Sequence, residues 1–279
     1  MKRYSLSDKV VLITGAGRGL GAATATALAD RGARVVLADI DPTTAQGVAA
    51  TLPRGRALAL KCDVTQLDSV QEAVLRTREE FGRIDVVVAN AGILGKSATF
   101  SALTPDQVRG VMSVNVDGVV NTVAATLDSV ISSRGQLVLV SSVFAFINGA
   151  GTIPYAMSKA AVEQFGRGLG VELAHHGASC MTAYFSLIET DMIRQGVDAD
   201  PHVLDLLSAS SPDFLLKRIP AATAAAAIID GLEHRQRSIT VPGRWRPFAA
   251  LRGVVGPILD AKLARDASVQ RAIVQLENR

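Results

Sequence analysis

Short apolar runs alternate with segments of helical periodicity along most of the chain. The runs that predict strands are Val10–Thr14, Arg34–Asp39, Ala57–Lys61, Val86–Ala89, Gln136–Ser141, Ser179–Phe185 and Ser238–Val241. Helices are predicted between them, at Gly19–Arg31, near Pro42, and at Asp68–Phe81, Asp106–Ser132, Pro154–His175 and Ala221–His234. This alternation predicts an α/β fold, in which a doubly wound, mostly parallel seven-stranded sheet carries helices on both faces.

Composition adds little to this picture but excludes several classes of protein. Of 279 residues, 48% are hydrophobic and 20% are charged, which is ordinary for a globular chain. The net charge of +3 comes from scattered residues, so we expect no nucleic-acid partner. We also expect no secretory signal and no membrane span, hence a cytoplasmic protein. Cys62 and Cys180 are predicted to be buried free thiols.

A glycine-rich loop follows the first predicted strand and precedes a predicted helix. Its residues are Gly15, Ala16, Gly17, Arg18, Gly19, Leu20 and Gly21. Glycines in this position permit a tight turn, so that backbone N–H groups approach a pyrophosphate at the helix N-terminus. The loop therefore predicts a dinucleotide site in a Rossmann-like domain.

Asp39 ends the second predicted strand, and Ile40 follows it. A carboxylate at this position can accept hydrogen bonds from the hydroxyls of an adenosine ribose, and it would repel a 2′-phosphate. Arg18 favours NADP instead, because a cation in the loop could reach that 2′-phosphate. Since Asp39 occupies the ribose position itself, we expect NAD in preference to NADP.

Tyr155 and Lys159 lie four residues apart in a predicted helix, so they share one helix face. Free tyrosine ionises near pH ~10, which makes it a poor base at neutral pH. A neighbouring ammonium stabilises the phenolate, and we therefore expect Lys159 to lower the pKa of Tyr155. The pair predicts a tyrosine that transfers a proton at a carbon–oxygen bond.

Taken together, these segments resemble the short-chain dehydrogenases/reductases from about Leu6 to Val241. The matching pieces, in chain order, are Thr14–Gly21, Asp39, Cys62-Asp63-Val64, Asn90-Ala91-Gly92, Asn115, Ser141-Ser142 and Tyr155 with Lys159. The resemblance implies NAD(P)-dependent oxidation of alcohols or reduction of ketones. It also implies a homodimer or homotetramer that assembles through the helices near 106–132 and 154–175.

The resemblance assigns a role to each matching residue. Tyr155 would be the general acid/base, Lys159 would also hold the nicotinamide ribose, and Ser142 would bond the substrate oxygen. Asn115 would hold a water for proton relay in a distorted helical turn. The remaining residues would contact the dinucleotide: Asp63 and Val64 at the adenine, Asn90, Ala91 and Gly92 beside the cofactor, and Ile188 and Thr190 at the carboxamide.

One departure from the family falls after the sixth predicted strand. The family usually has Pro-Gly there, whereas this chain has Phe185-Ser186. We expect an altered turn, with Phe185 adding bulk near the nicotinamide and the substrate. Phe144, which follows the fifth predicted strand, is a second candidate for contact with substrate.

Residues 1–242 are expected to form one catalytic domain, and residues 243–279 a helical extension. An irregular, largely apolar stretch at about 191–219, broken by Pro201 and Pro212, is predicted to cover the substrate. A lipophilic secondary alcohol or ketone is the expected substrate. The apolar stripe of the extension is expected to pack on the protein or a partner subunit, with an interfacial membrane helix as the alternative. Pro257 is expected to kink or split this helix.

Two other functions stay open at the level of sequence. One is an NADP-dependent carbonyl or 3-oxoacyl reductase, which the cation of Arg18 would favour. The other is a redox sensor that binds dinucleotide without catalysis, which the altered turn at Phe185 would favour. No spacing of Cys, His and carboxylate residues predicts a metal site.

Overall fold

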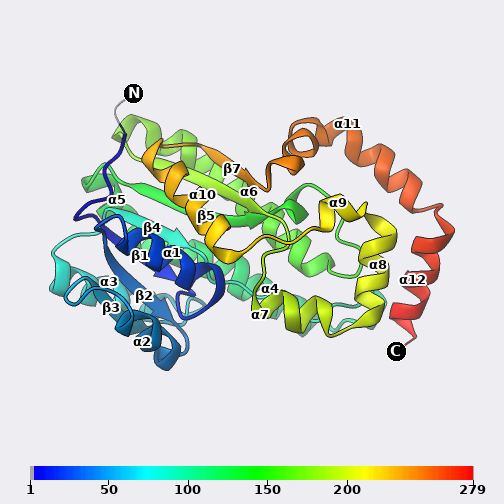
Figure 1. Ribbon diagram of the computed structural model, residues 1–279, viewed down its shortest axis with the longest axis horizontal. Helices are drawn as coiled ribbons and strands as arrows, with labels where there is room; N and C mark the ends of the chain where they lie inside the picture. The colour runs from blue at the N-terminus through cyan, green and yellow to red at the C-terminus, as the bar shows by residue number, and fades with distance from the viewer. Residues whose placement is uncertain (1–2, 279) are drawn as a thin grey trace.

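Seven parallel strands form the single sheet of the protein, as seen in a computed structural model that describes residues 3–278 (Figure 1). Their order across the sheet is β3-β2-β1-β4-β5-β6-β7. The strands are β1 (Val10–Thr14), β2 (Arg34–Asp39), β3 (Ala57–Lys61), β4 (Val86–Ala89), β5 (Gln136–Ser142), β6 (Ser179–Phe185) and β7 (Ser238–Val241). The predicted doubly wound fold is confirmed.

Helices cover both faces of the sheet. One face carries α1 (Gly19–Ala29), α2 (Pro42–Ala50) and α10 (Ala221–Glu233), and the other carries α3 (Leu67–Phe81), α5 (Gly118–Ser132) and α6 (Ile153–Glu172). Successive residues of a strand point to opposite faces. In β2, Val35 therefore packs towards α1, whereas Val36 packs towards α3 and α5. Burial on both faces explains the continuous apolar strand sequences.

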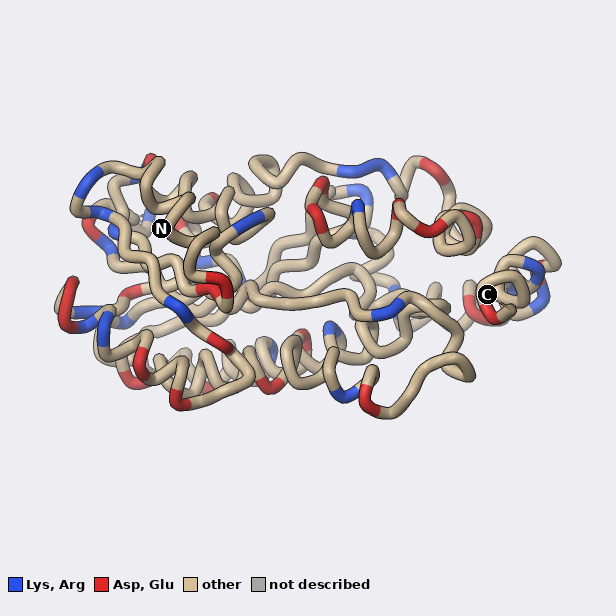
Figure 2. Tube along the Cα trace, turned by 90° about the horizontal axis from the view of Figure 1, so that it is seen from below, with Lys and Arg blue, Asp and Glu red and all other residues tan. Residues whose placement is uncertain are grey.

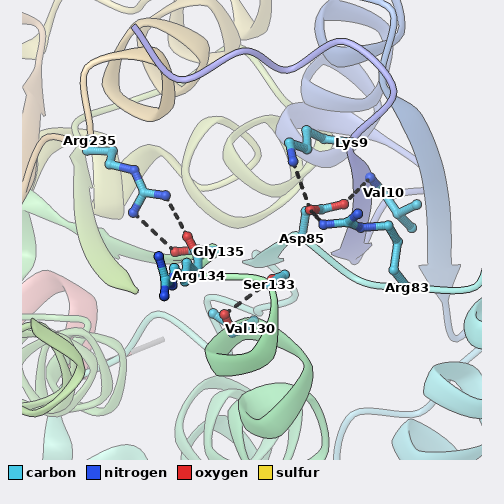
Figure 3. Close-up of polar contacts among 9 residues, drawn as sticks. All are labelled: Lys9, Val10, Arg83, Asp85, Val130, Ser133, Arg134, Gly135 and Arg235. Atoms are coloured by element: carbon cyan, nitrogen blue, oxygen red, sulfur yellow. Dashed lines mark hydrogen bonds and ion pairs between the residues drawn. The ribbon is translucent and has the colours of Figure 1, made fainter. Parts of the chain in front are cut away.

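Polar contacts stabilise the amino-terminal edge of the sheet (Figure 3). The carboxylate of Asp85 is fully buried and accepts hydrogen bonds from Lys9 at 3.2 Å, Arg83 at 2.5 Å and the backbone of Val10 at 3.0 Å. Arg235 donates to the carbonyl of Arg134 at 2.5 Å. The contacts join the starts of neighbouring strands, at the edge opposite the glycine-rich loop.

The predicted helix Asp106–Ser132 is divided into three parts. Helix α4 (Pro105–Met112) and helix α5 are joined by a π-helical turn at Ser113–Asp117. Helix α4 begins with a capping box, in which Thr104 and Gln107 satisfy each other's backbone N–H groups. The π turn carries Asn115 and makes the side chain face inwards, where it is fully buried.

The stretch 191–219 was predicted to be irregular but contains short helices. They are α7 (Asp191–Ile193), a π turn at Arg194–Asp198, α8 (Pro201–Ser210) and α9 (Asp213–Leu216). Pro201, read as a break, is instead the first residue of α8, where its missing N–H costs nothing. The carboxylate of Asp200 caps this helix by accepting from the backbone of His202 at 3.0 Å.

Two helices follow the last strand, and the second of them lies beside α8 (Figure 1). They are α11 (Arg246–Leu263), which continues through Pro257, and α12 (Ala267–Glu277). Pro257 therefore does not split the helix. Helix α12 packs its buried Val269 and Leu276 against Leu206 of α8. Within residues 3–278, no helix combines the length and apolar content that crossing a bilayer requires.

Charged residues of both signs are intermixed over the surface (Figure 2). The two cysteines, by contrast, are buried and free, as predicted. Burial raises the pKa of Cys62 to about 11 and that of Cys180 to about 12. Both thiols are therefore protonated and unreactive at neutral pH.

Candidate active site

Gly15 and Gly21 of the glycine-rich loop are packed too tightly to carry a side chain. Gly15 has a φ of +64° and Gly19 a φ of +55°, values that glycine adopts without strain. A Cβ on Gly15 would lie 2.8 Å from the Cα of Ala91, and a Cβ on Gly21 would lie 2.2 Å from the carbonyl oxygen of Gly15. The loop thus presents bare backbone at the N-terminus of α1, as phosphate binding requires.

Asn90 ties this loop to the end of β4. Its side-chain amide donates to the carbonyls of Thr14 at 2.9 Å and Gly15 at 3.0 Å. The hydroxyl of Thr14 in turn accepts from the backbone of Asn90 at 3.1 Å and Ala91 at 3.2 Å. The sequence analysis gave no role to Thr14, although a polar residue ending an otherwise apolar strand was a usable signal.

Asp39 lies directly beside the loop. One carboxylate oxygen accepts from the backbone of Gly17 at 2.8 Å, and the other accepts from the backbone of Asp41 at 3.1 Å. Each oxygen keeps a further lone pair for a hydroxyl donor. Hydrogen bonds from Thr43, with a smaller contribution from the charge of Arg18, lower the pKa of Asp41. Arg18 therefore lies close enough to the carboxylate of Asp41 for their charges to interact.

The residues expected at the adenine lie further along the same edge. Asp63 accepts hydrogen bonds from the backbone and hydroxyl of Thr65, at 3.0 and 2.8 Å. The carbonyl of Val64 accepts from Asn121 at 2.9 Å. The side chain of Ile40 is 63% exposed and offers an apolar surface next to Asp39.

Tyr155 and Lys159 are on α6, which begins with Pro154 in its first turn. The ammonium of Lys159 is buried, donates to the carbonyl of Val140 at 2.9 Å and lies 5.5 Å from the centre of the Tyr155 ring. Burial lowers the pKa of Lys159 to about 8. The two side chains therefore share one face of the helix at the carboxyl edge of the sheet.

The pKa of Tyr155 differs from the expectation. Burial raises it, and a hydrogen bond with Ser142 acts in the opposite direction without reversing the effect. The charge of Lys159 is not among the causes. The net lowering that we expected is therefore not found for the protein by itself, because removal of the phenol from water disfavours the phenolate more than its neighbours favour it.

Ser141 and Ser142 point to different partners. The hydroxyl of Ser141 donates to the carbonyl of Lys159 at 2.8 Å, which fixes α6 against β5. The hydroxyl of Ser142 donates to the carbonyl of Phe185 at 3.0 Å and is the one that bonds Tyr155. Ser142 could donate to a substrate oxygen only by releasing the Phe185 carbonyl.

Asn115 reaches this centre from the π turn. Its amide oxygen accepts from the backbone of Ile93 at 2.8 Å, and its amide nitrogen donates to the carbonyl of Ile93 and the hydroxyl of Ser158, each at 2.9 Å. A Cβ on Gly92 would lie 3.2 Å from the amide oxygen of Asn115 and 3.5 Å from Nζ of Lys159. Only glycine leaves this space free. Ser158 was missed by the sequence analysis.

Two cavities meet at this centre. The smaller, about 160 Å³, is lined by the predicted cofactor residues Gly15, Arg18, Gly19, Leu20, Asn90, Ala91, Gly92, Tyr155, Lys159, Ile188 and Thr190. Other predicted cofactor residues lie outside its wall, namely Gly17, Gly21, Asp39, Ile40, Asp63 and Val64. The larger cavity, about 590 Å³, is mainly apolar and extends beneath α8 and α11. Both cavities share Tyr155, Ser186, Met192 and Ile193.

The two phenylalanines expected near the substrate have different positions. Phe144 lines the larger cavity, and its ring meets that of Tyr155 edge to face, with centroids 5.8 Å apart. Phe185 is 3% exposed and belongs to the core beneath α1 and α10, so it contributes to the wall of the smaller cavity only. Its expected position beside the substrate is not found.

No metal ligands assemble at this centre. Among residues 3–278, no group of three or more His, Cys, Asp or Glu side chains could hold an ion.

A doubly wound fold with a glycine-lined cavity beside a tyrosine and a lysine is the arrangement found in oxidoreductases that use a dinucleotide cofactor. The family model described as short chain dehydrogenase matches residues 9–200. The chain therefore belongs to the short-chain dehydrogenase family and is an NAD(P)-dependent dehydrogenase or reductase.

Individual relatives are consistent with this assignment. The chain is 34% identical over 185 residues to meso-2,3-butanediol dehydrogenase of Serratia marcescens, covering 66% of this chain and 73% of that protein. The crystal structure of 3-ketoacyl-(acyl-carrier-protein) reductase from Brucella melitensis complexed with NADH superposes with a TM-score of 0.74 and 26% identity, covering 85% of this chain and 95% of that one. Levodione reductase gives a TM-score of 0.74 and 28% identity, with 84% and 95% covered.

Proposed function

We propose that this protein interconverts a lipophilic secondary alcohol and the corresponding ketone, with NAD as the redox partner. The observation that carries the proposal is the meeting of the two cavities at Tyr155, one lined by glycine backbone and the other by apolar side chains. A reacting carbon between them would lie beside a proton-transferring phenol.

The residues at the smaller cavity fit a dinucleotide. Gly15 and Gly19 leave room for phosphates at the N-terminus of α1, and Asp39 retains acceptor sites for ribose hydroxyls. Ile40 would lie against the adenine, with Asp63 at its amino group. Lys159 and Tyr155 would hold the second ribose. When bound, NAD would supply the hydride acceptor of the reaction.

The acidic neighbourhood of Arg18 favours NAD over NADP. Asp39 and Asp41 lie on the same side of the loop, and Arg18 already interacts with Asp41. A 2′-phosphate placed here would face two carboxylates. The relative from Brucella melitensis was crystallised with NADH.

In this proposal, Tyr155 takes the hydroxyl proton of the alcohol. Its raised pKa keeps it protonated at rest, so it must be made more acidic as the reaction proceeds. The nearby ammonium of Lys159 and the positive charge of an oxidised nicotinamide would both act in that direction. Ser142 holds the phenol oxygen, and Asn115, through Ser158, connects the centre to the π turn.

The larger cavity supports a bulky, apolar substrate. Phe144, Leu206, Leu215, Phe248 and Leu259 are among its lining residues. Its volume of about 590 Å³ lies within the range of pockets that enclose drug-sized ligands. A steroid- or terpene-like alcohol would bury its surface there.

The exposed apolar residues of two helices support assembly into an oligomer. Val120 on α5 is 41% exposed, and Met157 and Val171 on α6 are 47% and 76% exposed. We propose a homodimer or homotetramer that covers these side chains. Light scattering of the purified protein measures the number of subunits directly.

A spectrophotometric screen tests the proposed reaction. Purified protein is mixed with NAD or NADP and a panel of secondary alcohols from 2-propanol to steroid alcohols, and absorbance of the reduced cofactor is followed. We expect reduction of NAD with the bulky apolar alcohols, and little reduction of NADP. Turnover only with NADPH and acyl thioesters would instead support a 3-oxoacyl reductase, the second candidate suggested by the Brucella melitensis relative and by Arg18.

A further inference from the structure

Glu163 is a buried carboxylate on the helix that carries Tyr155 and Lys159. The three residues follow one another at intervals of four, so they lie along one side of α6. Glu163 is 5% exposed. A carboxylate taken out of water requires a cation or several hydrogen bonds nearby.

Arg252 of α11 provides that cation. Its guanidinium nitrogen lies 2.6 Å from one carboxylate oxygen of Glu163 and 2.7 Å from the other. Arg167, on the same helix as Glu163, is more distant, at 3.8 Å, and its side chain is 59% exposed. The close partner of this buried charge therefore comes from the C-terminal extension of the chain.

Helix α11 lies on the surface of the protein. It contains no fully buried residue, and its outer side chains Leu251, Val254 and Ile258 are each more than half exposed. A second polar contact joins Asp260 to Asn148, at 2.9 Å. The apolar contacts of α11 lie near its ends, where Phe248 packs against Trp245 and Leu263 packs against the cluster between α8 and α12. The ion pair of Arg252 joins the middle of α11 to the catalytic helix.

The inner side of α11 forms part of the larger cavity. Phe248, Val255 and Leu259 line this cavity, as does Arg252 itself, and Tyr155 lines both this cavity and the smaller one. The position of α11 relative to α6 therefore sets the length of the space available to a substrate.

We propose that Arg252 is a positioning residue that determines substrate size. Its ion pair with Glu163 holds α11 at a fixed distance from the helix of Tyr155, so that a bulky substrate contacts both. This inference rests on the proposed function. A small alcohol held only at the Tyr155 end would be insensitive to the pair.

Kinetics with two substrates test this role. The variants are Arg252→Met, Glu163→Gln, the double variant, and Arg246→Met as a control that removes the same charge from an exposed position on α11. With NAD, we expect both single variants to raise KM for a steroid alcohol about tenfold, as for loss of a charged hydrogen bond. The kcat/KM for 2-propanol should stay within about twofold. The double variant should equal the worse single variant.

Several outcomes would overturn the inference. They are an unchanged ratio of steroid to 2-propanol KM, additive effects in the double variant, or the same rise in Arg246→Met. A loss confined to carboxylated substrates would show that Arg252 binds substrate directly. Arg252→Lys should restore part of the steroid KM, which separates loss of the charge from misfolding.

Hydrogen exchange tests the link without turnover. Amides of residues 246–263 should exchange faster in Arg252→Met than in the wild type, whereas those of α5 should be unchanged. Equal exchange in the two proteins would overturn the inference. A wild type that oxidises no alcohol would overturn the proposed function instead, and the exchange result would still decide whether Arg252 anchors α11.

Discussion

The side-chain amide of Asn115 donates a hydrogen bond to the hydroxyl of Ser158 at 2.9 Å, and that hydroxyl donates to the carbonyl of Tyr155 at 2.7 Å. The π turn between α4 and α5 is thereby connected to the first turns of α6. This connection holds the backbone of Tyr155 in place and links it, through Asn115, to the backbone carbonyl of Ile93.

Asn115→Leu preserves the approximate size of the side chain but removes these hydrogen bonds. We expect kcat to fall about 10²-fold, within the range for loss of a group that assists proton transfer. The Kd for NAD, measured by fluorescence titration, should change little. Ser158→Ala, which removes only the second bond, should cost less. An unchanged kcat in Asn115→Leu would exclude a role for the π turn in catalysis.

Tyr155→Phe removes the proposed acid/base and retains the ring packed against Phe144. We expect kcat to fall by at least about 10³-fold with a nearly unchanged Kd for NAD. The matched control is Tyr4→Phe, because the buried hydroxyl of Tyr4 is remote from the cavities and bonds nothing among the described residues. Near wild-type turnover by Tyr155→Phe would refute the assignment.

Gly21→Ala should abolish NAD binding, since the new Cβ would lie 2.2 Å from the carbonyl oxygen of Gly15 and displace the loop. The control is Gly47→Ala in α2, where nothing lies within 4 Å of the added atom. That control should stabilise the protein by about 0.5–1 kcal/mol, the helix preference of alanine over glycine. Calorimetric titration and thermal melting measure the two effects. Tight NAD binding by Gly21→Ala would contradict the proposed cradle.

The buried ammonium of Lys159 makes stability depend on pH. Its pKa is about 8 in the folded state, against 10.5 as a free side chain. Below pH 8 Lys159 is protonated in both the folded and the unfolded state, so the folded state is destabilised by the full free energy of burying the charge. Between about pH 8 and 10.5 only the folded state releases it, so stability rises with pH, by on the order of 3 kcal/mol in total.

This dependence is isolated by comparison with Lys159→Met. Urea unfolding of both proteins from pH 7 to pH 10 should show the wild type gaining stability relative to the variant above pH 8. Other titrating groups cancel in the difference. A difference that stays constant with pH would mean that the lysine has an ordinary pKa.

Much of the fold was predictable because the central strands are buried on both faces. Runs such as Val86–Ala89 are continuously apolar for that reason, and a polar residue at the strand end marks the edge where ligands bind. The glycine loop, Asp39 and the Tyr155–Lys159 pair follow from local spacing. They could therefore be read without knowledge of the tertiary structure.

Other features depend on contacts that are distant in sequence. The π turn is stabilised by bonds from Asn115 to Ile93 and Ser158, which no helical periodicity reveals. The pKa of Tyr155 is raised by its burial within the folded protein, which residue spacing does not report. Glu163 and Arg252 are 89 residues apart, so neither suggested the other.

Met192 and Ile193, on α7, line both the glycine-bounded cavity and the apolar one. Any shift of this short helix alters two binding equilibria together. If a ligand in one cavity stabilises a particular position of α7, a ligand in the other cavity binds to α7 already in that position. Because linkage is reciprocal, each ligand then raises the affinity for the other by the same factor. Cooperativity between unlike ligands can thus arise inside a single subunit.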